Sequence, residues 1–193
     1  MKKELRPILI VHTLVVLSFA VVYMTRENYE FMIYLGAIIL LTLLVWFSMK
    51  KIRYPTGLLW ALVIWTFLHL AGGVVPVGDD VLYGWMVLPL SETYPILRFD
   101  QLVHAYGFGT MAFMVYTLLK PFIKIKAKDS TAFSIVIVMG ALGFGALNEI
   151  LEFTAVVLAP RTGVGGYLNT SLDQVFNFIG ALIALFIIRW KRI

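Results

Sequence analysis

The chain has 193 residues, of which 61% are hydrophobic and 14% are charged, and its mean hydropathy is +0.89. Soluble domains are about half apolar, so this composition excludes an ordinary soluble enzyme and indicates a protein embedded in lipid. The net charge of +5 does not indicate nucleic-acid binding, because the basic residues flank apolar segments and form no continuous patch. The chain has no cysteine, which excludes disulfides and thiolate sites.

Six apolar segments follow one another along the chain. Each is long enough to cross a hydrocarbon core of about 30 Å as a helix that rises about 1.5 Å per residue. The predicted spans cover about residues 7–24, 31–49, 57–75, 100–119, 131–158 and 172–190. They leave only short loops, so we expect residues 1–193 to form a single transmembrane domain. The predicted fold class is therefore all-α, a polytopic integral membrane helical bundle with six transmembrane helices.

The basic residues lie mainly on one side of these spans. Thirteen of the 16 precede the first span, follow the second or fourth span, or follow the sixth: Lys2, Lys3, Arg6, Lys50, Lys51, Arg53, Lys120, Lys124, Lys126, Lys128, Arg189, Lys191 and Arg192. Only Arg26, Arg98 and Arg161 fall on the other side. Positively charged loops stay in the cytoplasm. This distribution predicts a protein of the cytoplasmic membrane, surrounded by its lipid bilayer, with both termini in the cytoplasm.

The longest predicted loop, residues 76–99, lies on the outer side between the third and fourth spans. Its segment 81–88 is apolar and aromatic but too short to cross the membrane. We expect this segment to lie half-buried in the interface as a flap.

Ionisable side chains, with two asparagines beside them, lie within the last four spans. A charged group inside an apolar helix costs several kcal/mol by the milder estimates, so it needs a partner or a function. The residues are His69 in the third span; Asp100 and His104 in the fourth; Asn148, Glu149 and Glu152 in the fifth; and Asp173 and Asn177 in the sixth. Partners three or four positions apart share one helix face. From the direction of each span, we expect seven of these residues, all but Asn148, to lie in one layer in the outer half of the bundle.

Three interpretations of this polar layer remain open. The first is a hydrogen-bonded network that only fastens the helices together. The second is a divalent metal site for Zn, Mn or Fe, with His104, Glu149, Glu152 and Asp173 as ligands, because such metals accept imidazole and carboxylate donors. The third is a metal-free acid/base or proton site in which His104 relays protons.

The motifs of the last three spans resemble a known family. Phe99-Asp100-Gln101-Leu102-Val103-His104, Asn148-Glu149-Ile150-Leu151-Glu152 and Asp173-Gln174-Val175-Phe176-Asn177-Phe178-Ile179-Gly180 resemble the ordered motifs of YjdF-like membrane proteins of unknown function, and more loosely the VanZ-like family. The VanZ-like pattern has an arginine in the loop before the last helix, which Arg161 matches. It has glutamine where this chain has Glu152, so the resemblance favours the YjdF-like group and implies no named reaction.

The functional hypothesis is a membrane-embedded site, metal-dependent and enzymatic, that acts on a lipid or envelope-linked substrate entering from the outer leaflet. Its catalytic candidates are Asp100, His104, Glu149, Glu152 and Asp173, with His69, Asn148, Asn177 and Arg161 in supporting positions. The alternative is a transporter or proton-coupled carrier, since intramembrane ionisable residues also mark transport pathways. The sequence indicates no oligomeric state.

Overall fold

A computed structural model describes residues 3–123 and 130–191. This part of the chain contains six α-helices: α1 (Leu5–Thr25), α2 (Tyr29–Ser48), α3 (Thr56–Gly72), α4 (Phe99–Leu119), α6 (Thr131–Leu158) and α7 (Tyr167–Trp190). Two short strands, β1 (Pro76–Val77) and β2 (Asp80–Val81), and two 3₁₀ turns, η1 (Leu82–Gly84) and η2 (Lys120–Phe122), complete it. The predicted all-α helical bundle is confirmed. The basic residues Lys2, Lys124, Lys126, Lys128 and Arg192 lie outside the described residues.

Five of these helices, α1, α2, α4, α6 and α7, are long and apolar enough to cross a membrane. The remaining helix, α3, is apolar but has 17 residues and ends at Gly72, before the predicted limit at residue 75. Gly73 takes the C-cap position, and the chain then enters β1 at Pro76, which cannot continue a helix. At the other end, α7 begins at Tyr167, five residues before the predicted limit at residue 172.

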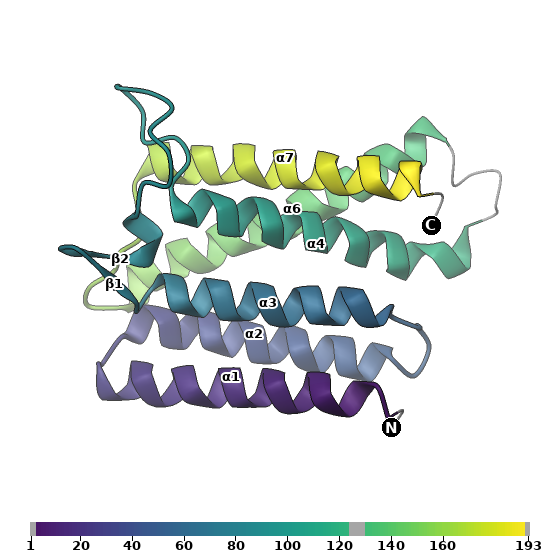
Figure 1. The fold of residues 1–193 in the computed structure, drawn as a ribbon, viewed down its shortest axis with the longest axis horizontal. Coiled ribbons are helices and arrows are strands. Elements are labelled where there is room, and N and C mark those ends of the chain that lie inside the picture. Colours follow the sequence, from purple (N-terminus) through teal and green to yellow (C-terminus); the bar gives the residue numbers. More distant parts are fainter. Residues whose placement is uncertain (1–2, 124–129, 192–193) are drawn as a thin grey trace.

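The helices run back and forth along one axis (Figure 1). Both termini lie at one end of the bundle, and β1, β2 and the long loop lie at the other end (Figure 1). Helix α4 is the central element, because α3, α6 and α7 all pack against it. The polar motifs of α4, α6 and α7 therefore belong to three helices that contact one another.

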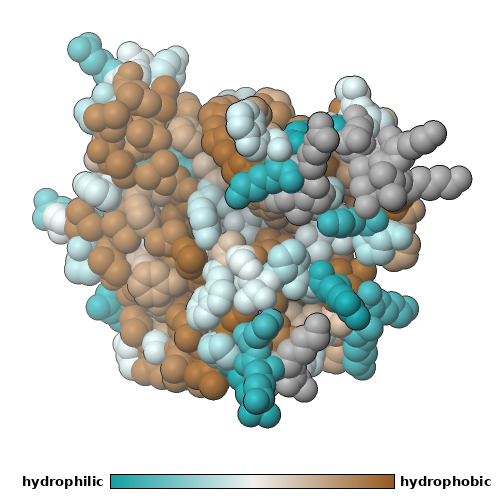
Figure 2. Space-filling model, turned by 45° about the vertical axis from the view of Figure 1, so that its right-hand side comes forward, coloured by the Kyte–Doolittle hydropathy of each residue, from teal (hydrophilic) through white to brown (hydrophobic). Residues whose placement is uncertain are grey.

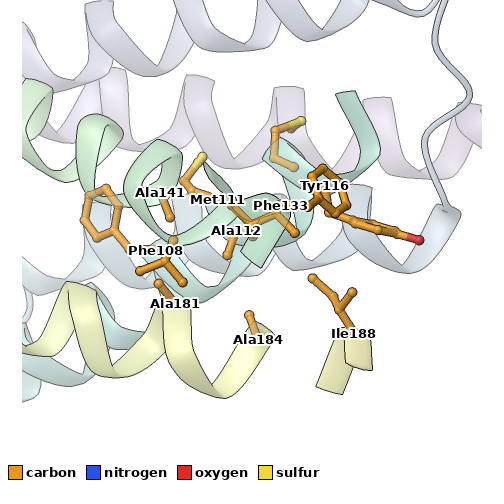
Figure 3. Close-up of a cluster of buried hydrophobic side chains, with 12 residues drawn as sticks. Phe108, Met111, Ala112, Tyr116, Phe133, Ala141, Ala181, Ala184 and Ile188 are labelled. Carbon is orange, nitrogen blue, oxygen red and sulfur yellow. The ribbon is translucent and has the colours of Figure 1, made fainter. Parts of the chain in front are cut away.

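Small residues bring α4, α6 and α7 close together. Their shared core includes Phe108 and Ala112 of α4, Ala141 of α6, and Ala181 and Ala184 of α7 (Figure 3). At Gly180 of α7 the two backbones come so close that an added Cβ would collide with the carbonyl group of Ala105 of α4. This close packing holds the polar faces of α4 and α7 against each other.

The outer surface of the bundle is strongly apolar. Large hydrophobic side chains stand exposed on the outward faces of α1, α2, α6 and α7, for example Leu14, Leu44, Phe153 and Phe186. Figure 2 shows hydrophobic side chains over much of the surface, with hydrophilic side chains gathered toward the ends. Such a surface is stable against lipid chains and not against water.

Candidate metal centre

The first part of the polar layer is the start of α4. Gln101 is fully buried, and its side-chain oxygen accepts hydrogen bonds from the backbone N–H groups of Leu97, at 2.6 Å, and Arg98, at 3.1 Å. Its amide nitrogen donates to the carbonyl oxygen of Pro95 at 2.9 Å. These bonds satisfy backbone groups that a helix start leaves without partners. They fix the start of α4, where Asp100 lies in the first turn and His104 in the second.

The start of α7 contributes a ladder of three polar residues spaced four apart, Asn169, Asp173 and Asn177. Asp173 and Asn177 are fully buried. The Asn169 amide donates to Asp173 Oδ2 at 2.6 Å and lies 3.4 Å from Asp100 Oδ2. It therefore holds the two aspartates together and leaves Asp173 Oδ1 without a hydrogen-bond partner among the described residues.

The buried imidazole of His104 lies between α4 and α7. Its Nδ1–H donates to Asn177 Oδ1 at 3.0 Å, since a carbonyl oxygen can only accept. In a neutral ring this bond leaves the lone pair on Nε2, which faces Asp100 Oδ1 at 3.5 Å. Protein histidines that bind metals are held by such a bond at the other ring nitrogen. Asn177 thus orients His104 to offer Nε2 as a ligand.

Helix α6 brings two half-buried glutamates to the same imidazole. The Asn148 amide donates to Glu152 Oε1 at 2.7 Å. Thr170 and Asn148 lie beside the Glu149 carboxylate, but neither of its buried oxygens makes a hydrogen bond of good geometry to a described residue. Glu149 therefore keeps both oxygens available for a ligand.

His104 is the member shared by two groups of donor atoms. Asp100, His104 and Asp173 each place one donor atom within 4.8 Å of the others, and so do His104, Glu149 and Glu152. Metal bonds to nitrogen and oxygen are about 2.0–2.2 Å long, so side-chain shifts of about 1 Å would close either group around an ion. The structure thus brings together all five of the residues that the sequence predicts as catalytic candidates.

His69 lies apart from these two groups, in an aromatic cage. Its ring stacks on Trp65 with centroids 5.4 Å apart and lies close to Phe31 and Tyr34. The hydroxyl of Tyr83 lies 2.5 Å from His69 Nδ1. His69 therefore contacts the long loop and not the donor groups.

Tyr83 belongs to η1, within the segment that the sequence predicts to be a flap. Its ring fills the space beside Gly72, where a Cβ would collide with it, and lies 6.5 Å from the Phe99 ring between centroids. Burial, and next the nearby Asp100 carboxylate, raise the pKa of the Tyr83 hydroxyl well above its ordinary value. Tyr83 is therefore neutral and anchors the loop over the start of α4.

Arg161 is exposed in the loop between α6 and α7 and forms no ion pair with a carboxylate of the described residues. Asn169, Gln101 and Glu30 also shape this region, although none of them was predicted as a site residue. Glu30 is buried at the start of α2 and accepts a hydrogen bond from the backbone N–H of Gly163 at 2.6 Å, which fastens the α6–α7 loop to α2. The four-residue spacing of Asn169 from Asp173 was a signal that could have found it.

A family model described as predicted membrane protein (DUF2238) matches residues 6–192. This match fits the resemblance to YjdF-like membrane proteins of unknown function and extends it from the last three helices to nearly the whole chain. Neither a curated protein nor a solved structure matches the chain. The chain is a multi-pass membrane protein and belongs to the DUF2238 family.

Proposed function

We propose that this protein is a metal-dependent membrane enzyme whose buried carboxylate–histidine centre acts on a lipid or envelope-linked substrate. The observation that carries the proposal is the pair of donor groups that share His104. The buried, unpartnered oxygens of Glu149 and Asp173 support it, because buried polar atoms normally have partners.

The charge of the centre favours a cation. Four carboxyl groups, Asp100, Glu149, Glu152 and Asp173, surround one imidazole inside an apolar bundle. Ionised carboxylates in such surroundings are costly unless protons or a positive ion neutralise them. No lysine or arginine of the described residues forms an ion pair with any of the four. Arg98 at the N-cap of α4 is the basic residue near the centre, and one positive charge does not balance four carboxylates. A divalent ion would supply the remaining charge.

The donor set suits Zn, Mn or Fe, since these ions accept imidazole and carboxylate ligands. We assign His104, Glu149, Glu152 and Asp173 as the principal ligands, with Asp100 as ligand or acid/base group. Asn177 and Asn169 are positioning residues that orient His104 and the two aspartates. When bound, a metal would supply Lewis-acid chemistry to a substrate oxygen or to water.

The position of the centre indicates the class of substrate. Glu149 and Glu152 are half-buried, and Ile150 and Phe153 between and beside them are exposed on the apolar surface of α6. The second donor group therefore lies near the surface that lipid covers. A substrate that reaches it from the bilayer would itself be a lipid or be attached to one.

We further propose that both termini face the cytoplasm and that the centre lies in the outer half of the cytoplasmic membrane. Lys50, Lys51, Arg53, Lys120 and Lys191 flank the helix ends on the side of the termini, as the positive-inside rule requires. Reporter fusions at the C-terminus and in the 76–99 loop test this orientation. Cytoplasmic reporter activity in the loop fusion would reverse it.

The transporter hypothesis has weaker support. A carrier needs a polar route from the centre to the opposite end. None of the five catalytic candidates lines the apolar pocket between α1, α2 and α3 or the groove between α3, α4 and α7. The VanZ-like resemblance likewise gains no support from Arg161, which lies outside the centre.

The test is the metal content of purified protein, measured by elemental analysis after exposure to Zn²⁺, Mn²⁺ or Fe²⁺ and removal of excess ion. We expect the unaltered protein to retain at least about one tightly bound ion per chain. Both His104→Ala and Glu149→Gln should lower this content, because each removes a donor. Glu92→Gln is the matched control, since Glu92 is an exposed carboxylate in the long loop.

Absence of metal from the unaltered protein, with equal metal content in Glu149→Gln, would refute the metal centre.

The proposed enzyme activity is tested separately. The metal-loaded protein is incubated with membrane lipids, and mass spectrometry follows their conversion. Conversion that is unchanged in Glu149→Gln would refute the catalytic assignment.

A further inference from the structure

A long groove runs between α3, α4 and α7, and no residue of α6 lines it. Its cavity volume is about 1090 Å³. The groove starts near the end of the bundle that carries the termini and reaches Ala105 and Gly180, where α4 and α7 meet. No residue of the candidate metal centre lines it.

The two ends of this groove differ in charge. Four exposed basic residues, Lys51, Arg53, Lys120 and Lys191, line its mouth, and no acidic residue lines any part of it. The Lys120 ammonium lies 5.5 Å from the centre of the Tyr116 ring, which keeps it beside the mouth. The mouth therefore offers a concentrated positive charge to an anion.

Beyond the mouth the groove is mainly apolar, because the hydroxyls of Tyr106, Thr110 and Thr117 that line it donate to backbone carbonyls. Its walls there include Ala61 of α3, Phe113 of α4 and Ile183 of α7. From Lys120 to Ala105 along α4 the distance is about 22 Å at 1.5 Å per residue. One leaflet contributes about half of a 30 Å hydrocarbon core. The apolar part is thus long enough to hold a full lipid chain of one leaflet.

We propose that this groove binds an anionic phospholipid, with its phosphate at the four basic residues and one acyl chain along α3, α4 and α7. The positive mouth selects the charge of the headgroup, and the apolar walls accept the chain. A soluble anion would use the mouth alone and leave the apolar walls exposed. The groove is separate from the metal centre, so this site does not depend on the proposed enzyme activity.

The experiment measures lipid retention by native mass spectrometry. Detergent-solubilised protein is mixed with equal amounts of phosphatidylglycerol and phosphatidylcholine. We expect the unaltered protein to retain phosphatidylglycerol preferentially. Each of Lys51→Gln and Lys120→Gln should reduce that retention about fivefold, as expected for about 1 kcal/mol per basic residue near an anionic lipid. Lys50→Gln is the matched control, because Lys50 is a neighbouring exposed lysine that does not line the groove.

A second pair of variants tests the chain site. Gly57 lines the groove and has open space where a side chain would begin, so Gly57→Phe should fit the fold and obstruct the groove. Gly36 of α2 also has open space and does not line the groove, so Gly36→Phe is its control. Gly57→Phe should lower phosphatidylglycerol retention severalfold and Gly36→Phe should not.

Equal retention of the two lipids by the unaltered protein would overturn the proposal. So would an equal effect of Lys50→Gln and Lys51→Gln. Loss in the lysine variants with no loss in Gly57→Phe would show that only an anion binds at the mouth, and would also overturn it.

Discussion

The contact between Gly180 of α7 and Ala105 of α4 leads to a sharp stability prediction. In Gly180→Ala, the new Cβ would collide with the carbonyl group of Ala105. Overpacking of this kind costs about 1–3 kcal/mol. The helix propensity of alanine offsets part of this cost, because alanine stabilises a helix by about 1 kcal/mol relative to glycine. The matched control is Gly143→Ala on α6, where the Cβ meets nothing within 4 Å.

Both variants gain the same helix propensity, so the difference between them isolates the packing cost. Thermal unfolding of the detergent-solubilised protein, followed by tryptophan fluorescence, measures it. For a chain of this size each kcal/mol shifts Tm by about 2–4 °C. We therefore expect Gly180→Ala to melt about 2–12 °C below Gly143→Ala. Equal melting temperatures would refute the close α4–α7 contact.

The same substitution bears on the candidate centre. Asn177 lies three residues before Gly180 and accepts its bond from His104 at 3.0 Å. A separation of α4 and α7 by about 1 Å would carry this bond beyond useful length. Gly180→Ala should therefore also weaken metal binding, and Gly143→Ala should not.

Two further predictions concern single side chains. In Asn177→Leu, His104 loses the partner that orients its ring. Metal affinity, measured by competition titration with a chelator, should therefore fall about 10–100-fold. An unchanged affinity would contradict the role of Asn177. In Tyr83→Phe, His69 loses its hydroxyl partner, and we expect a loss of about 1–3 kcal/mol near neutral pH in the same melting assay. Because the pKa of Tyr83 is raised in the folded protein, its contribution is present below about pH 10 and is lost as the pH rises further. Stability should then fall less steeply above pH 10 in Tyr83→Phe than in the unaltered protein, and parallel curves would contradict this.

Much of the bundle was predictable because hydropathy and helix length are local properties. An apolar run of about 20 residues has few alternatives to a membrane helix, and five of the six predicted spans meet that description as helices. The ends of α3 and α7 were less predictable. Polar residues such as Asn169 lower the local hydropathy, so the predicted span began after them although the helix includes them.

The candidate centre, like the bundle, was predictable from the sequence only in part. The spacing of Asp100 from His104, and of Glu149 from Glu152, is enough to place each pair on one helix face. His69 shows the limit of this reasoning. Its depth in the bundle is compatible with the polar layer, yet its ring lies among Phe31, Tyr34 and Trp65 and meets Tyr83 of the long loop.

By itself, the sequence determined the helical class, the apolar surface and the polar face of each helix, because these depend on side-chain chemistry and on a period of 3.6 residues. Only the tertiary structure decided which faces meet. The rotation and spacing of neighbouring helices depend on contacts between distant residues, such as Gly180 with Ala105. Those contacts place His104 within reach of carboxylates from α4, α6 and α7, and no local pattern contains that information.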